Sequence, residues 1–185
     1  VSILTTGFPI VFLLLLLIFL IVIIGSKLNQ KYLSDFDFDD GFVLVTKGQS
    51  YLITDFRYVE AATEQRNPEL EVLMPNIGML TCMEELLREN GCRKVMIEEE
   101  TLSFADYGKY SEKLTGMELC PGASALLEEL RLYKDEKELE TMARAQAVTD
   151  AAFAHILNFI KPEMTEIEVA LELEFFMRRN GADGL

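Results

Sequence analysis

Few side chains of this sequence have the types and spacing that an active site requires. The chain has one histidine, His155, and the residues three and four positions from it are Ala151, Ala152, Asn158 and Phe159. No carboxylate or second histidine shares that helical face, which excludes a His-x-x-x-His metal site. Nucleophile-elbow, dinucleotide-binding and P-loop patterns are also missing from the sequence. We therefore expect His155 to be a packed or surface helical residue.

Two further groups of side chains have the chemistry of metal ligands. Cys82, Cys92 and Cys120 form no C-x-x-C pair, so the sequence predicts reduced thiols and no zinc site. The acidic run Glu98–Glu100 follows a predicted strand and could bind a cation. A solvated charge run is the more common meaning of such a pattern, and we expect it here.

The charge balance limits the partners of the protein. Its 185 residues include 17 Lys and Arg against 31 Asp and Glu, a formal net charge of −14. So acidic a surface is unsuited to phosphate backbones, which excludes nucleic acid as an expected partner. The length suits one domain of about 100–150 residues and part of another.

The chain opens on a long apolar run, in which every residue from Ile10 to Ile24 is Ile, Leu, Val or Phe. With its flanks the run covers residues 8–25, about 18 residues or about 27 Å of helix, close to the thickness of a bilayer core. It predicts a transmembrane or anchor helix within residues 1–26. Two alternatives stay open. Ile18–Ile24 can be a buried first strand, because strands buried on both faces are also continuously aliphatic, or the run is a frameshift or gene-calling artefact.

Alternating apolar residues and turn signals predict an α/β domain after this run. Phe42–Thr46 and Ser50–Thr54 flank the turn Lys47-Gly48-Gln49, which is typical of a hairpin. Strands and helices then alternate, with helices expected at 58–65, 78–91 and 103–114 and strands at 70–74, 94–99 and 117–119. This order favours a mixed sheet covered by helices.

A second region begins near Cys120-Pro121-Gly122 and is almost wholly helical. A long amphipathic helix ends at Lys161-Pro162, and the next begins with the capping-box spacing of Thr165 and Glu168. Two helices without a sheet do not make a complete domain. We therefore predict a first domain over residues 27–120 and the incomplete beginning of a second over 121–185.

Four segments carry a family resemblance, which covers the chain from about Asn29 to Leu185. In order and spacing, they resemble the Xaa-Pro aminopeptidase and prolidase family of metallopeptidases: "NQKYLSDF", "GFVLVTKGQSYLITDFRYVEAA", "LRLYKDEKELETMARAQAVTDAAF" and "IKPEMTEIEVALELEFFMRRNGADGL". The resemblance implies a creatinase-like N-terminal domain over 27–120. Over 121–185 it implies the first two helices of a pita-bread catalytic domain. In the first segment, Asp35 stands where the family has glycine.

The same resemblance implies a cofactor and partners. The family binds two divalent metals, with manganese expected, through two aspartates, one histidine and two glutamates that follow a segment like "GADGL". Two such ions activate a bridging water for hydrolysis. Because the sequence ends at Leu185, we expect no metal ligand and no catalytic residue in it, and an inactive chain. The resemblance also implies a peptide substrate with proline at its second position, a homodimer and a cytoplasmic location.

Asp55, Arg57 and Tyr58 in "TDFRYVEAA" are the residues of the first domain that most resemble the family. The resemblance implies that they contact the substrate or a neighbouring subunit's catalytic domain. The alternative is a strand-to-helix corner held by an Asp–Arg hydrogen bond, with Asp55 favourably placed near a helix N-terminus.

Two functions from different classes follow from these observations. The first is a fragment of a Xaa-Pro aminopeptidase or dipeptidase, which hydrolyses the peptide bond preceding proline. The alternative is a non-enzymatic, membrane-anchored creatinase-like module that binds a peptide or a protein. A fragment would leave the apolar side chains of its last two helices without a covering sheet, namely Phe153, Leu157, Phe175, Phe176 and Met177.

Overall fold

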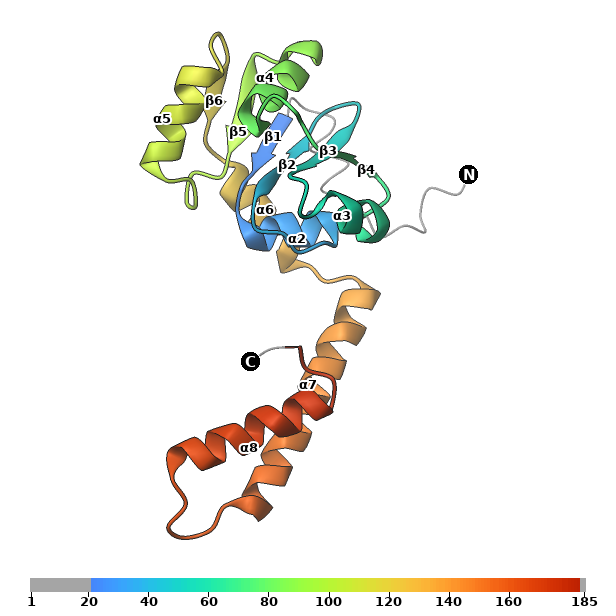
Figure 1. The fold of residues 1–185 in the computed structure, drawn as a ribbon, viewed down its shortest axis with the longest axis vertical. Coiled ribbons are helices and arrows are strands. Elements are labelled where there is room, and N and C mark those ends of the chain that lie inside the picture. The colour runs from blue at the N-terminus through green and yellow to red at the C-terminus, as the bar shows by residue number, and fades with distance from the viewer. Residues whose placement is uncertain (1–20, 184–185) are drawn as a thin grey trace. The chain divides into compact units, whose positions relative to one another are not determined.

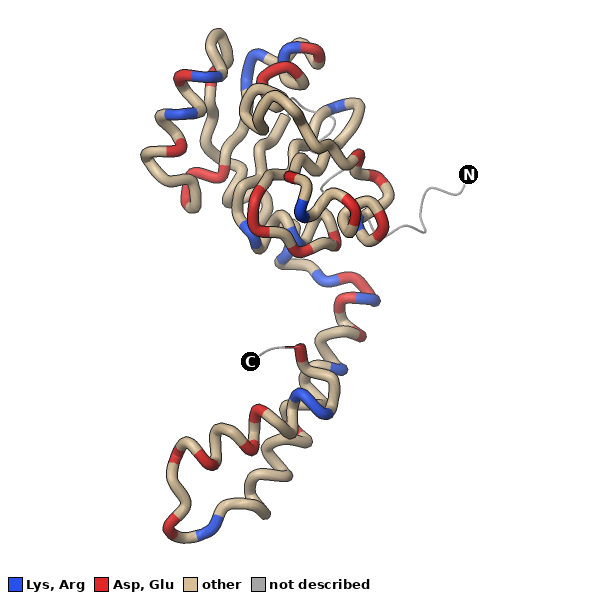
Figure 2. Tube along the Cα trace, viewed as in Figure 1, with Lys and Arg blue, Asp and Glu red and all other residues tan. Residues whose placement is uncertain are grey.

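The computed structural model describes residues 21–183, and the chain divides into two compact units (Figure 1). The first unit reaches Leu132 and contains the sheet, and the second runs from Tyr133 to Leu185. Acidic and basic side chains are interspersed along both units (Figure 2).

A six-stranded mixed sheet with the order β4-β3-β2-β1-β5-β6 forms the centre of the first unit. Strand β2 is antiparallel to both β1 and β3, whereas β1 with β5, β3 with β4, and β5 with β6 pair in parallel. The strands are β1 (Ile21–Ile24), β2 (Gly41–Val45), β3 (Ser50–Thr54), β4 (Leu70–Leu73), β5 (Lys94–Ile97) and β6 (Glu118–Cys120). The mixed α/β class predicted from the sequence is confirmed, and so is the β2–β3 hairpin, in which Phe42 pairs with Ile53.

Helices cover both faces of this sheet in two apolar layers. One layer joins Val22, Ile24 and Val43 to α2 (Lys27–Ser34), α3 (Val59–Gln65) and α6 (Ala123–Leu132). The other joins Ile21, Ile23 and Leu44 to α4 (Met79–Glu89) and α5 (Phe104–Lys113). Successive strand residues point to opposite faces, so each strand contributes to both layers.

The described end of the apolar run is the strand β1. For this part of the chain, a strand replaces the helix that was predicted within residues 1–26. Ile21–Ile24 are at most 5% exposed, and β1 lies between β2 and β5. The described part of the aliphatic run is therefore a strand that is buried on both faces, as the buried-strand alternative for Ile18–Ile24 predicted. The rest of the run lies outside the described residues. Within residues 21–183, no helix is long and apolar enough to cross a membrane.

Helix α2 has defined caps at both ends. The hydroxyl of Ser26 accepts a hydrogen bond from the backbone N–H of Asn29. Asp35 ends the helix in the left-handed conformation, with φ 57°, and its N–H donates to the carbonyl of Lys31. Glycine adopts this conformation with the least strain, which agrees with the glycine that the family resemblance implies at the position of Asp35.

The second unit contains two helices, α7 (Glu136–Phe159) and α8 (Glu166–Arg179), which pack against each other. Both begin with a capping box, formed by Asp135 with Glu138 and by Thr165 with Glu168. The predicted capping box of α8 is thus confirmed. Phe153, Leu157 and Phe175 are each more than half exposed, whereas Phe176 stacks on the ring of His155.

Candidate functional site

Strand direction gathers the polar side chains of the first unit at one edge of the sheet. Strands β1, β3, β4, β5 and β6 run in the same direction, so their carboxyl ends lie together with the start of β2. Ligands of open α/β sheets bind at such an edge. We define the carboxyl edge as Gly25–Ser26, the loop 35–40, Asp55–Tyr58 and Glu98–Ser103. It includes all three residues singled out from the sequence.

Arg57 is held by two carboxylates at the corner between β3 and α3. Its Nε lies 3.0 and 3.2 Å from the two carboxylate oxygens of Asp55, and Nη2 donates to Asp40 as well. The hydrogen bonds from Arg57 hold the pKa of Asp55 below its ordinary value, and Asp55 and Asp40 together raise the pKa of Arg57. The corner therefore contains the Asp–Arg hydrogen bond that was predicted for a purely structural strand-to-helix corner.

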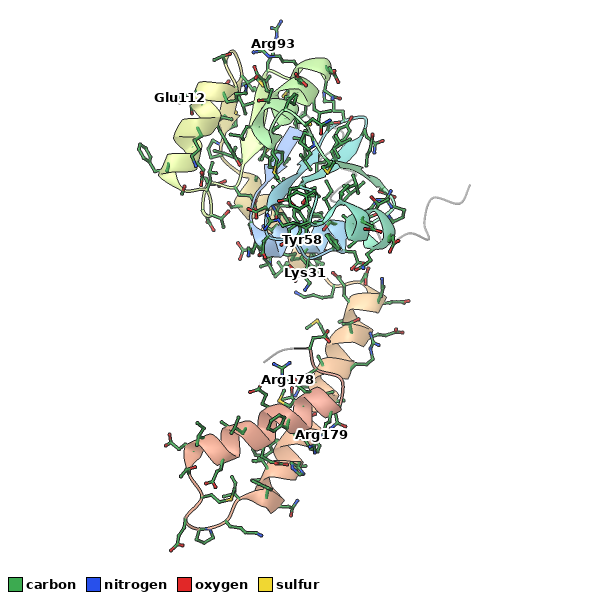
Figure 3. The ribbon with its side chains drawn as sticks, in the orientation of Figure 1. Lys31, Tyr58, Arg93, Glu112, Arg178 and Arg179 are labelled. Carbon is green, nitrogen blue, oxygen red and sulfur yellow. The ribbon has the colours of Figure 1, made fainter. Side chains whose placement is uncertain are left out.

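Tyr58 extends this network toward α2. Its hydroxyl donates to Asp39 at 3.2 Å, and Lys27 of α2 forms an ion pair with the same carboxylate. Lys27 and then Tyr58 lower the pKa of Asp39. The guanidinium of Arg57 also lies 5.3 Å from the centre of the Tyr58 ring. The loop 35–40 thereby links α2, which contains Lys31, to Tyr58 at the start of α3 (both residues are labelled in Figure 3).

The charges of this network decide what it can bind. Among the described residues, the three carboxylates of Asp39, Asp40 and Asp55 pair with two cations, Lys27 and Arg57, so acidic groups are in excess in this network. Both cations already have carboxylate partners, and the side chain of Arg57 is 48% exposed. A free anion would therefore compete with two built-in carboxylates, whereas a protein surface with basic or hydrogen-bond-donor groups would be attracted.

Glu98 corrects the expectation of a solvated charge run. It is 3% exposed, and its Oε2 accepts the backbone N–H groups of Gly25 and Ser26 at 2.7 and 2.8 Å. Its Oε1 accepts the side-chain amide of Asn29 at 2.6 Å. Glu98 thus fastens the end of β5 to the junction of β1 and α2.

The other two glutamates of the run behave differently. Glu99 accepts the backbone N–H of Gly122 at 2.9 Å, and this contact lowers its pKa. Glu100 is exposed. Burial therefore separates Glu98 from Glu99 and Glu100, which are both exposed.

A pocket of about 210 Å³ opens beside Glu98. Its walls come from the β1–α2 junction, the start of β2, the end of β5, and α5 with the loop before it. The lining residues are Ile23, Gly25, Ser26, Gly41, Ile97, Glu98, Thr101, Leu102, Ser103, Asp106 and Tyr110. Burial, followed by the nearby Asp106 and Glu98, raises the pKa of Tyr110, so its hydroxyl is protonated at neutral pH.

His155 finds its polar partner on the other helix of the second unit. Its Nε2 lies 2.7 Å from Oε1 of Glu172 on α8. Its ring stacks on Phe176 with centroids 4.3 Å apart. The packed histidine expected from the sequence is confirmed. The residues near His155 in the sequence do not indicate this partner, because Glu172 lies on α8.

The described residues do not fit a metal centre. Within residues 21–183, no group of three or more His, Cys, Asp or Glu side chains could hold a metal ion. Cys82, Cys92 and Cys120 are free thiols, as predicted. No catalytic step through a metal is therefore derived from these residues.

Comparison with protein families gives the context of this edge. A sequence model of the Creatinase/Prolidase N-terminal domain matches residues 21–133. The chain belongs to the creatinase/prolidase family. A model of metallopeptidase family M24 matches residues 140–185. The first match begins at the first residue of β1 and includes the whole sheet, and the second includes α8 and most of α7.

This family member is also similar in sequence and structure to individual peptidases. An uncharacterised peptidase of Bacillus subtilis is 33% identical over 162 residues, which are 88% of this chain and 45% of the relative. A solved Xaa-Pro dipeptidase from Bacillus anthracis has a TM-score of 0.82 and 36% identity, covering 89% of this chain and 45% of that chain. The chain thus spans about half the length of these relatives. The N-terminal domain of a cytoplasmic peptidase from Mycobacterium tuberculosis, 26% identical, has a TM-score of 0.53 over 60% of this chain and 85% of its own.

Proposed function

We propose that this family member supplies the N-terminal domain and the first catalytic helices of a Xaa-Pro aminopeptidase or dipeptidase. Such an enzyme hydrolyses the peptide bond preceding proline, and its substrate is a peptide with proline at the second position. One observation carries the proposal. The two family models match consecutive parts of the chain, and a Xaa-Pro dipeptidase of 36% identity aligns along 89% of it.

Within that enzyme, we assign the first unit, which adds β1 and α6 to the predicted residues 27–120, to the substrate-gating domain, and the part of the predicted region 121–185 from Tyr133 onward to the start of the catalytic domain. The enzyme would use two divalent metals, with manganese as the metal to test first, and would act as a cytoplasmic homodimer. M24 membership supports the need for divalent metals. The membrane-anchored binding module has no comparable support, because the described end of the apolar run is a central strand.

Asp55, Arg57 and Tyr58 would contact a neighbouring subunit's catalytic domain rather than bind substrate as free groups. Two features support this role. Arg57 already has two carboxylate partners, and the neighbouring side chain of Phe56 is 77% exposed. An exposed aromatic ring beside a fixed charged network is typical of a protein interface.

A chimera tests the proposed activity. Residues 1–185 would replace the matching part of the Bacillus anthracis dipeptidase, and hydrolysis of Ala-Pro and Ala-Ala would be measured with manganese. We expect the chimera to hydrolyse Ala-Pro far faster than Ala-Ala, and the chain alone to hydrolyse neither. Equal rates on both dipeptides by a folded dimeric chimera, or Ala-Pro hydrolysis by the chain alone, would contradict the proposal.

Variants of the same chimera test the interface. Arg57→Ala should lower kcat/KM for Ala-Pro by about tenfold and weaken the dimer in size-exclusion chromatography, because Asp40 and Asp55 lose the cation that holds them in place at the proposed interface. Arg93→Ala is the matched control. Arg93 is exposed just before β5, at the opposite edge of the sheet (Figure 3). Unchanged activity and dimerisation in Arg57→Ala would remove this corner from the interface.

A further inference from the structure

The pocket beside Glu98 contains a buried charge without a counter-ion. All three hydrogen bonds to the Glu98 carboxylate come from neutral donors, namely two backbone N–H groups and the amide of Asn29. No described Lys, Arg or His forms a salt bridge with it. Burying a carboxylate is costly unless a positive group or enough hydrogen bonds compensate it. A cation in the pocket would complete this compensation.

The hydrogen-bonding groups around Glu98 have acceptor capacity to spare. A carboxylate oxygen can accept two hydrogen bonds, and Oε1 of Glu98 accepts one, from Asn29. Tyr110 lines the pocket, and its hydroxyl makes no hydrogen bond to a described residue. Behind Glu98, Oδ1 of Asn29 is buried and lacks a partner among the described residues. The pocket therefore offers a cation two acceptors with spare capacity, Oε1 of Glu98 and the hydroxyl of Tyr110.

The remaining walls define the chemical class of the ligand. Asp106 adds a second carboxylate, although Lys109 and Ser103 already donate to it. None of the described residues that line the pocket is Lys, Arg or His. Two carboxylates are too few for a protein-held divalent metal, and the described residues contain no metal-binding group. Ile23, Ile97 and Leu102 form an apolar wall, which an inorganic ion would not use.

We propose that this pocket binds a small primary amine, with its ammonium group against Glu98 and its alkyl part against Ile23, Ile97 and Leu102. The three N–H donors of an ammonium match Glu98, the hydroxyl of Tyr110 and the carboxylate of Asp106. The pocket of about 210 Å³ exceeds the roughly 10–15 Å³ that one water needs, so it accommodates a short alkyl chain as well. The pocket lies at a topological switch point, where chain connections leave β1 and β5 in opposite directions along the sheet.

Titration of the 185-residue chain with n-butylammonium chloride tests the proposal by ¹H–¹⁵N NMR. Sodium butyrate and sodium chloride are the matched controls for chain length and salt. We expect saturable shifts of the Gly25, Ser26 and Thr101 amides with butylammonium alone. The absence of saturable shifts at these amides, or equal shifts with butyrate, would overturn the proposal.

Variants separate the pocket from general attraction to an acidic protein. Tyr110→Phe and Asp106→Asn should each weaken butylammonium binding about tenfold, because the first removes an acceptor for the ammonium and the second removes a negative charge beside it. Glu112→Gln is the control, since Glu112 is an exposed carboxylate on the same helix (Figure 3) and should leave the Kd unchanged. An unchanged Kd in both pocket variants, or an equal loss in Glu112→Gln, would contradict binding in the pocket.

Discussion

At the scale of the residue, burial decides the role of side chains that the sequence makes look alike. Glu98, Glu99 and Glu100 are adjacent, yet Glu98 is buried and fastens β5 to the β1–α2 junction, whereas Glu99 and Glu100 are exposed, and only the Glu99 carboxylate accepts the N–H of Gly122. His155 is similar, because its partner Glu172 comes from another helix. The residue type limits the interactions that a side chain can make, and the fold decides which of these interactions it makes.

Removal of the Glu98 side chain should destabilise the first unit strongly. Glu98→Ala leaves two backbone N–H groups and the Asn29 amide without their acceptor, which we expect to cost about 2–4 kcal/mol. Glu98→Gln should cost less, since its amide oxygen still accepts and its NH₂ can donate to the free Oδ1 of Asn29. Urea unfolding measures both, with Glu100→Ala as the exposed control. Equal stability of Glu98→Ala and the control would refute this role.

The corner at Arg57 should make stability depend on pH in the acidic range. Arg57 lowers the pKa of Asp55 from its ordinary value of 3.8. A carboxyl group whose pKa is lower in the folded state stabilises the protein above its unfolded pKa. That contribution is lost as the pH falls below about 4 through the folded pKa. Thermal unfolding of the wild type and Arg57→Ala should therefore differ at pH 6 and converge as the pH falls toward 2. A pH-independent difference would contradict the pairing.

At the scale of the element, the local signals predicted most helices but missed two, namely α6, which has an apolar buried face, and α2, which does not. The buried residues of α2 are Asn29, Gln30, Leu33 and Ser34, mostly polar. Gln30 donates to the carbonyls of Ile24 and Gly41 at 3.1 and 3.0 Å. The usual helical spacing of apolar residues is therefore missing. Only the presence of β1 beside it shows why this segment is a buried helix.

The C-terminal cap of α2 should be improvable by one substitution. Asp35 has a φ of 57°, where a side chain is strained and glycine is not. We expect Asp35→Gly to stabilise the protein by about 0.5–1 kcal/mol in urea unfolding. Asp35→Ala is the control, because it removes the carboxylate and keeps Cβ, and it should give no gain. If the two variants were equally stable, the carboxylate and not the backbone would limit this cap.

At the scale of the whole molecule, the fold of the first unit depends on a strand taken from the apolar run. Ile24 is fully buried in the layer that contains α2, α3 and α6, and β1 pairs on both sides. The second unit has its own helix pair with its own capping boxes. The two units therefore have separate sources of stability.

Ile24→Asp should unfold the first unit and spare the second. A buried, unpaired carboxylate in the central strand is expected to cost more than about 4 kcal/mol. Hydrogen exchange should then show unprotected amides in β1, β2 and β5 and unchanged protection in α8. Leu28→Asp is the control, since Leu28 is 60% exposed. Loss of protection in α8 as well would show that the two units fold together.

The sequence by itself determined the hairpin at Lys47-Gly48-Gln49, the capping box of α8 and the alternation of strands and helices. These features depend on residues within a few positions of each other, so local patterns contain the whole signal. Only the tertiary structure decided that Ile21–Ile24 is the central strand and that Glu98 is buried. The Glu98 carboxylate and the Gly25 amide are 73 residues apart in sequence, and the pocket that both residues line exists only because parallel pairing brings β1 beside β5.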